Sequence, residues 1–82
     1  MKKIFVGKEI LFPVSSFDSI KDKNLRRLIM MGMRFVVFDI KTKYIKGERA
    51  PALDMVEIMS TIDDHGSWVF ERHTLEDLVF RK

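Results

Sequence analysis

Met-Arg-Phe-Val-Val-Phe-Asp-Ile, residues 33–40, contains four consecutive β-branched or aromatic side chains, Phe35 to Phe38. A short apolar run of this kind is typical of a strand that is buried on both faces, at the centre of a sheet. From Asp39 onward one side of the alternation becomes charged. We therefore expect the strand to leave the core there and to end in solvent near residues 46–47.

The residues before this strand predict one longer helix, from about residue 18 to residue 31. Ser16, Asp18 and Ser19 are residue types that cap helix N-termini, and Gly32 suits the left-handed position after a helix end. Apolar residues recur at helical spacing over this segment and gather toward one side. These are Phe17, Ile20, Leu25, Leu28, Ile29 and Met31.

The N-terminus predicts two short strands, residues 3–6 and 9–14, joined by a tight turn at Gly7-Lys8. Pro13 has no N–H to donate, so the second strand should lie at an edge of the sheet or end there. A single strand with a glycine bulge is the alternative interpretation.

Residues 52–63 fit two patterns. As a helix they would begin after Pro51, a residue favoured in the first turn. As a strand they would alternate apolar and polar side chains and turn at residues 63–66 into a further strand, 67–72. The β-branched content and the turn residues favour the strand.

A short C-terminal helix is predicted over about residues 74–81, with Thr74 as its cap and Leu75, Leu78 and Val79 facing inward. The chain thus predicts a single small α+β domain, residues 1–82. We expect an antiparallel or mixed sheet of about four to five strands with helices on one face.

Length and composition narrow the possible classes of protein. A chain of 82 residues holds one core, and small domains often gain stability by association. Six Met and nine aromatic residues are many large apolar side chains for so short a chain. We therefore expect a homo-oligomer. There is no Cys, no apolar run near the roughly 18 residues that a membrane span needs, and no signal-peptide pattern. We therefore expect a cytoplasmic protein without membrane partners.

The charge is divided unevenly along the chain. Residues 1–49 carry 12 Lys/Arg against 5 Asp/Glu, whereas residues 50–82 carry 3 against 7. Such asymmetry within one domain favours an electrostatic partner, namely nucleic acid, an acidic protein or another copy of the chain. Two solvated faces of opposite sign are the simpler interpretation.

The residues that favour catalysis form one acidic and imidazole-rich group near the predicted hairpin. Two carboxylates and two imidazoles could hold a divalent metal or transfer protons. Their spacing matches no known metal motif, and a turn favours the same residue types. Because no nucleophile turn or glycine-rich phosphate loop is present either, we expect no enzyme and no cofactor. A metal-dependent enzyme around Asp63, Asp64, His65 and His73 stays the second alternative, and Glu71 is the further carboxylate of this group.

The residues that favour binding are basic and apolar. Lys23, Arg26 and Arg27 lie within the predicted helix on the side opposite its apolar residues, and Met30 is expected to be exposed beside them. Methionine is frequent at binding surfaces, and cations there can steer a partner. The sequence therefore predicts a non-enzymatic regulatory protein that binds a protein partner. Further basic candidates at the strand exit are Lys41, Lys43 and Lys46.

A nucleic-acid-binding regulator that uses the same basic residues is the first alternative. Phosphate neutralisation needs such clusters, but the helix-turn-helix pattern is missing because a strand follows the basic helix at once. The two hypotheses differ in their salt dependence, which is steep for phosphate contacts and shallow for an apolar interface.

Overall fold

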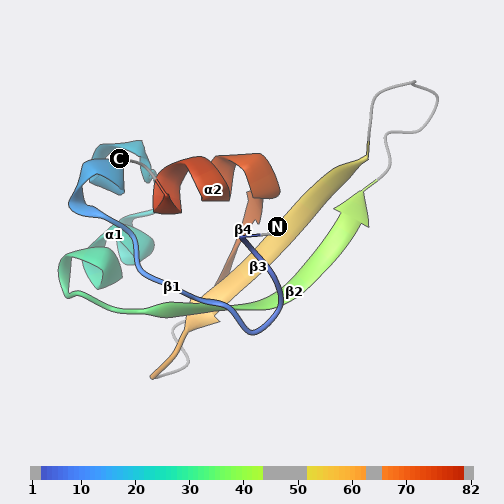
Figure 1. Ribbon diagram of the computed structural model, residues 1–82. Helices are drawn as coiled ribbons and strands as arrows, with labels where there is room; N and C mark the ends of the chain where they lie inside the picture. Colours follow the sequence, from blue (N-terminus) through green and yellow to red (C-terminus); the bar gives the residue numbers. More distant parts are fainter. Residues whose placement is uncertain (1–2, 44–51, 63–65, 81–82) are drawn as a thin grey trace.

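The computed structural model describes residues 3–43, 52–62 and 66–80. Within this part of the chain, four strands form one antiparallel sheet whose spatial order is the chain order. One 3-10 helix and two α-helices lie together on one face of the sheet (Figure 1). The predicted small α+β fold is confirmed. The elements are β1 (Glu9–Ile10), η1 (Val14–Ser19), α1 (Lys23–Met30), β2 (Phe35–Lys43), β3 (Leu53–Ser60), β4 (Ser67–Glu71) and α2 (Arg72–Val79).

Strand β2 occupies an inner position of the sheet, as its apolar run predicts, but it is covered on one face only. Phe35 and Val37 are fully buried, whereas Phe38 is 41% exposed and Val36 is half-buried. The prediction of a strand buried on both faces was therefore wrong. The reason is that the helices in the described part of the chain all lie on one face, and no described segment forms a second layer on the other (Figure 1). A register shift between Val37 and Asp39 makes Phe38 the extra residue of a β-bulge.

The prediction of two N-terminal strands was wrong for the first of them. Of the two predicted N-terminal strands, only the second forms, as β1, which pairs with β2; residues 3–6 form no strand. Gly7 turns the chain at a φ of 94°, its N–H donates to Val37 O at 2.7 Å, and Val37 N–H donates to Lys8 O at 2.9 Å. The segment before the turn places Ile4 in the core, where it is fully buried. Strand β1 ends before Pro13 and lies at the edge of the sheet, as expected.

Both helices begin at residues other than the predicted caps. The helix expected over residues 18–31 is two elements, η1 and α1, separated by an extended stretch that ends at Asp22. The C-terminal helix begins at Arg72, with Glu71 rather than Thr74 as its N-cap residue. Leu75 and Leu78 of this helix are buried, as predicted.

The ambiguous segment 52–63 is a strand, β3, over Leu53–Ser60, which confirms the favoured interpretation. It pairs antiparallel with β4, and the turn residues 63–65 lie outside the described residues. Trp68 and Phe70 share the face of β4 that packs against the core.

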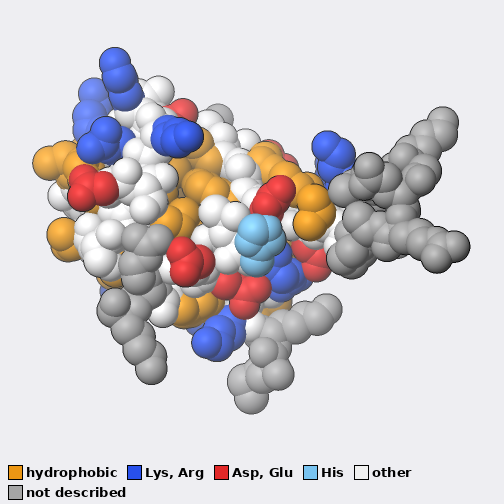
Figure 2. Space-filling model, turned by 90° about the horizontal axis from the view of Figure 1, so that it is seen from above, with side chains coloured by type: hydrophobic (Ala, Val, Ile, Leu, Met, Phe, Trp, Pro, Cys, Tyr) orange, Lys and Arg blue, Asp and Glu red, His pale blue; other side chains and the backbone are white. Residues whose placement is uncertain are grey.

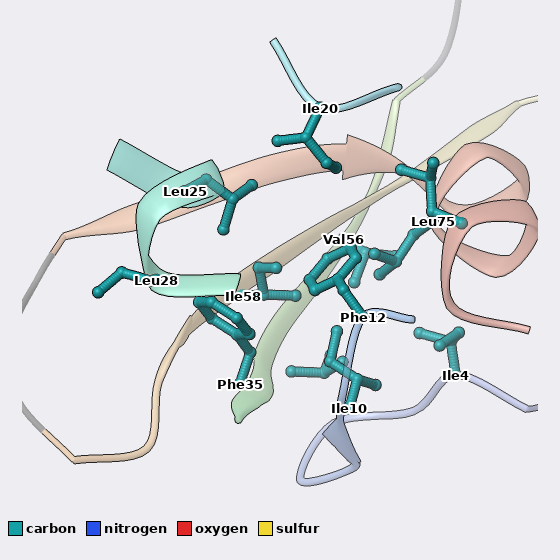
Figure 3. Close-up of a cluster of buried hydrophobic side chains, with 12 residues drawn as sticks. Ile4, Ile10, Phe12, Ile20, Leu25, Leu28, Phe35, Val56, Ile58 and Leu75 are labelled. Atoms are coloured by element: carbon teal, nitrogen blue, oxygen red, sulfur yellow. The ribbon is translucent and has the colours of Figure 1, made fainter. Parts of the chain in front are cut away.

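Aromatic rings join the sheet to its cover, and two of them, Phe12 and Phe35, are drawn in Figure 3. The Phe35 ring meets the Phe12 ring edge-on, with centroids 5.5 Å apart, and the Trp68 ring edge-on at 5.9 Å. Leu25 and Leu28 from α1 and Leu75 from α2 close the core above these rings. Apolar burial is thus concentrated between one face of the sheet and the helices. Among the described residues, no helix has the length and apolarity that crossing a membrane requires.

Candidate functional site

An apolar hollow lies between η1, α1 and the segment that joins β1 to η1. Its volume is about 390 Å³, which falls within the range of about 300–1,000 Å³ of ligand pockets. Val14, at the start of η1, is 90% exposed at its rim, and Met30, at the end of α1, is 73% exposed. Large apolar side chains of this exposure on a small domain are typical of an interaction surface. The hollow is lined by Phe12, Val14, Phe17, Asp18, Ile29 and Met30.

The turn that places η1 is held by a buried hydroxyl. Pro13 fixes an extended entry, and its carbonyl accepts bonds from Ser16 N–H at 3.0 Å and Ser16 Oγ at 2.8 Å. Because Ser16 is fully buried, its polar groups need these partners. The tight turn brings Val14 and Phe17 to the wall that faces α1.

The N-terminus of α1 is fixed by Asp22. Its backbone is extended, and a carboxylate oxygen accepts a hydrogen bond from Leu25 N–H at 2.9 Å. This is the arrangement of an N-cap residue, which satisfies one of the free amides of the first turn. The same bond, with further help from Trp68 and Asn24, lowers the pKa of the Asp22 carboxyl.

Arg26 does not line the hollow but stacks on Phe17, which does. Its guanidinium carbon lies 4.4 Å from the centroid of the Phe17 ring, within cation–π distance. Its Nε atom is buried and has no hydrogen-bond partner among the residues that the structure describes. A buried donor without an acceptor costs about 1–3 kcal/mol of stability, and a partner carboxylate that accepted a hydrogen bond from Arg26 would remove this cost.

The neighbouring methionines differ in their relation to the hollow. Met30 lines it, whereas Met31 is exposed to a similar degree, 67%, but is not part of the lining. The exposure of Met30 beside the basic helix face agrees with the sequence analysis. Lys and Arg side chains gather at this end of the molecule next to exposed apolar ones (Figure 2).

The structure does not bring the predicted basic residues together. Lys23, Arg26 and Arg27 lie on α1, near the start of β2, whereas Lys41 and Lys43 lie near its far end (Figure 1). Eight residues of strand separate the two ends of β2 by about 26 Å. Lys41 also lies 3.7 Å from Asp39 Oδ2, which partly neutralises it. Lys46 lies outside the described residues.

The acidic and imidazole-rich group is only partly described. Asp63, Asp64 and His65 lie outside the described residues. His73 Nε2 contacts Glu71 Oε2 at 2.6 Å, so these two side chains do meet, although His73 lies in α2 and Glu71 at the end of β4. In the described ranges 3–43, 52–62 and 66–80, no three His, Cys, Asp or Glu side chains are arranged to hold a metal ion.

Sequence reasoning found Met30 and Arg26 but missed the hollow itself. Phe17 was assigned to the buried side of a longer helix, and Val14 to a strand. The signal that could have revealed η1 is Pro-Val-Ser-Ser, residues 13–16, since Pro followed by Ser favours a tight turn. Comparison with family models, with curated proteins and with solved structures gives no match for this chain.

Proposed function

We propose that the chain is a small, non-enzymatic cytoplasmic protein that acts as a homo-oligomer and modulates a protein partner by binding it at the η1–α1 hollow. The observation that carries the proposal is the hollow, an exposed apolar depression lined in part by Met30 and by Phe17, on whose ring the Arg26 guanidinium stacks. Apolar anchors seated in pockets and flanked by charges dominate the energetics of protein interfaces.

The surroundings of the hollow favour a partner segment that is both apolar and acidic. Lys23 and Arg27 are exposed on α1, and Arg26 stacks on Phe17, a residue of the lining. One large apolar side chain of the partner would enter the hollow, and carboxylates beside it would meet the cations of α1. Basic residues around the anchor raise the association rate, while the anchor sets the dissociation rate.

The proposal can be tested by affinity capture from an extract of the source cells with matched variants. Met30→Asp should lose the captured protein, because a carboxylate would be placed in the apolar hollow. Met31→Asp is the control, since Met31 is equally exposed but lies outside the lining. The proposal fails if both variants capture the same proteins as the unmodified chain.

The nucleic-acid alternative uses the same cations and needs its own measurement. Fluorescence anisotropy of labelled single- and double-stranded oligonucleotides should show no saturable binding near physiological salt. Duplex binding that weakens with a log–log salt slope of about −0.9 per contacted phosphate would support the alternative instead. The separation of the two basic groups along β2 weighs against one continuous phosphate-binding surface.

A further inference from the structure

Within the part of the chain that the structure describes, β4 is an edge strand whose outer side pairs with no other strand. The hydrogen bonds of the sheet show which of its backbone groups point outward. On the side of β1, Val37 N–H donates to Lys8 O, and Val37 C=O accepts a hydrogen bond from Gly7 N–H. Neither group therefore points to β3. Arg34 O accepts a hydrogen bond from Thr61 N–H. The hydrogen bonds between β2 and β3 therefore fall at every second residue counted from Arg34, and not at Val37. Ile58, paired with Val37, therefore directs its backbone groups toward β4.

The same alternation continues into the edge strand. Ile58 faces Trp68 and Val56 faces Phe70, so the backbone groups of Trp68 and Phe70 bond to β3. The N–H and C=O groups of the alternate residue, Val69, then point away from the sheet. Val69 is 56% exposed.

The two edges of the sheet differ in how they are protected against further pairing. At one edge, β1 has two residues and is followed closely by Pro13. At the other, β4 has five residues and contains neither Pro nor Lys, the residues that commonly block edge pairing. Strand β4 is thus left available as a template for another strand.

We propose that β4 pairs antiparallel with β4 of a second copy of this chain, centred on Val69, so that the two sheets join into one. A two-fold axis at Val69 makes the two Val69 residues a hydrogen-bonded pair with two reciprocal N–H···O=C bonds. It also places Trp68 of each copy opposite Phe70 of the other, on the core face of the sheet.

Three features of β4 suit this symmetric pairing. Glu71 of each copy lies opposite Ser67 of the other, so the Glu71 carboxylates do not face one another. Aromatic residues form the cross-strand pairs on the core face. A recess of about 280 Å³ lies beside Trp68 and Phe70, between β4 and the segment before α1, and gives the partner's aromatic side chains room.

The test is the mass of the protein over a wide range of concentration, measured by sedimentation equilibrium. The mass of the unmodified protein should rise from that of one copy to that of two as its concentration increases. Val69→Pro removes the outward N–H without removing a bond to β3, so it should keep its circular dichroism spectrum and stay at the mass of one copy. Val69→Thr keeps the N–H and should still dimerise. A constant mass of one copy for the unmodified chain, or dimerisation of Val69→Pro, would overturn the proposal.

A second variant keeps the proposal falsifiable if Val69→Pro does not fold. The chain has no cysteine, so Val69→Cys introduces the only thiol. In a hydrogen-bonded antiparallel pair the two Cα atoms are about 5.5 Å apart, within disulfide range. Mild oxidation should give a disulfide-linked dimer of Val69→Cys and little of the control Val6→Cys, whose parent residue is also exposed at 59%. Equal cross-linking of both variants would contradict the β4 interface.

This interface is independent of the η1–α1 hollow. Met30→Asp should still dimerise, and Val69→Pro should still capture the partner protein. The partner site and the β4 interface can therefore fail separately, whereas a constant mass of one copy would also remove the homo-oligomer from the proposed function, on which this interface rests.

Discussion

Individual side chains in the core decide whether so small a domain folds. Phe35 is fully buried and contacts two other rings edge-on, so its loss would open a cavity that the surrounding helices cannot fill. Phe38, on the same strand, is 41% exposed on the uncovered face. The two residues form a matched pair for measuring what burial contributes.

We predict that Phe35→Ala destabilises the domain by about 3–5 kcal/mol, and Phe38→Ala by less than about 1 kcal/mol. The free energy of unfolding would be measured by urea denaturation followed at the single tryptophan. Similar losses for the two variants would contradict the one-sided core.

The N-cap of α1 makes the stability depend on pH. Because the Leu25 N–H bond lowers the pKa of Asp22 in the folded state, the stabilisation is present above the pKa of the unfolded chain. It is lost as the pH falls through the lower, folded pKa. Asp22→Ala should therefore melt at a lower temperature than the unmodified chain at neutral pH, and the difference should shrink in acid. A difference that is constant with pH would show that the carboxylate charge contributes nothing.

At the scale of elements, the strands were easier to predict than the helix boundaries. The apolar run of β2 and the alternation of β3 and β4 are local signals, and all three strands form. The predicted start of the first helix was wrong because Ser16, Asp18 and Ser19 also favour tight turns. Only tertiary packing selects Asp22 as the N-cap residue. The hollow was missed for a related reason. It exists only where η1 packs beside α1, and no single segment carries its pattern.

The connection from α1 to β2 depends on a left-handed residue. Gly32 has a φ of 76°, and a Cβ added there meets nothing within 4 Å. The cost of substitution is therefore backbone strain alone. Gly32→Ala should lose about 1–2 kcal/mol of stability, and Gly32→Asn less, because asparagine tolerates this conformation. Equal losses for the two variants, compared by thermal unfolding, would argue against strain as the cause.

At the scale of the whole molecule, Arg72 connects distant parts of the chain. Its Nε donates to Asp54 Oδ2 at 2.9 Å, and its other guanidinium nitrogen donates to Ile4 O at 2.6 Å. One side chain at the start of α2 thus holds both β3 and the N-terminal segment. Its side chain is 19% exposed, so these charge-assisted bonds are largely shielded from water.

We predict that Arg72→Met destabilises the domain by about 2–4 kcal/mol, since each hydrogen bond to a charged group contributes about 1.5–3 kcal/mol. Asp54→Asn removes one partner's charge and should cost less. A double-mutant cycle between the two substitutions should show coupling of about 1 kcal/mol or more. Additive effects would show that the Arg72–Asp54 contact contributes little.

The proposed partner site and the proposed dimer interface lie on different parts of an asymmetric molecule. The described helices cover one face of the sheet, and β4 lies at its edge (Figure 1). The apolar hollow lies beside α1, which carries Lys23, Arg26 and Arg27. Among the described residues, the predicted basic residues lie in separate groups on α1 and near the end of β2 and not on one surface. An account based on protein contact therefore uses the described features more fully than one based on nucleic acid.

The most direct measurement is site-specific photo-crosslinking in the source cells from the rim of the hollow. Val14→p-benzoylphenylalanine places the probe at the most exposed apolar residue of the lining, and the same replacement at Val6 is the control. We predict a discrete cross-linked protein from position 14, absent from position 6 and reduced by a second substitution, Met30→Asp. No adduct at position 14, or the same adduct at both positions, would contradict the assignment of the η1–α1 hollow as a protein-binding site.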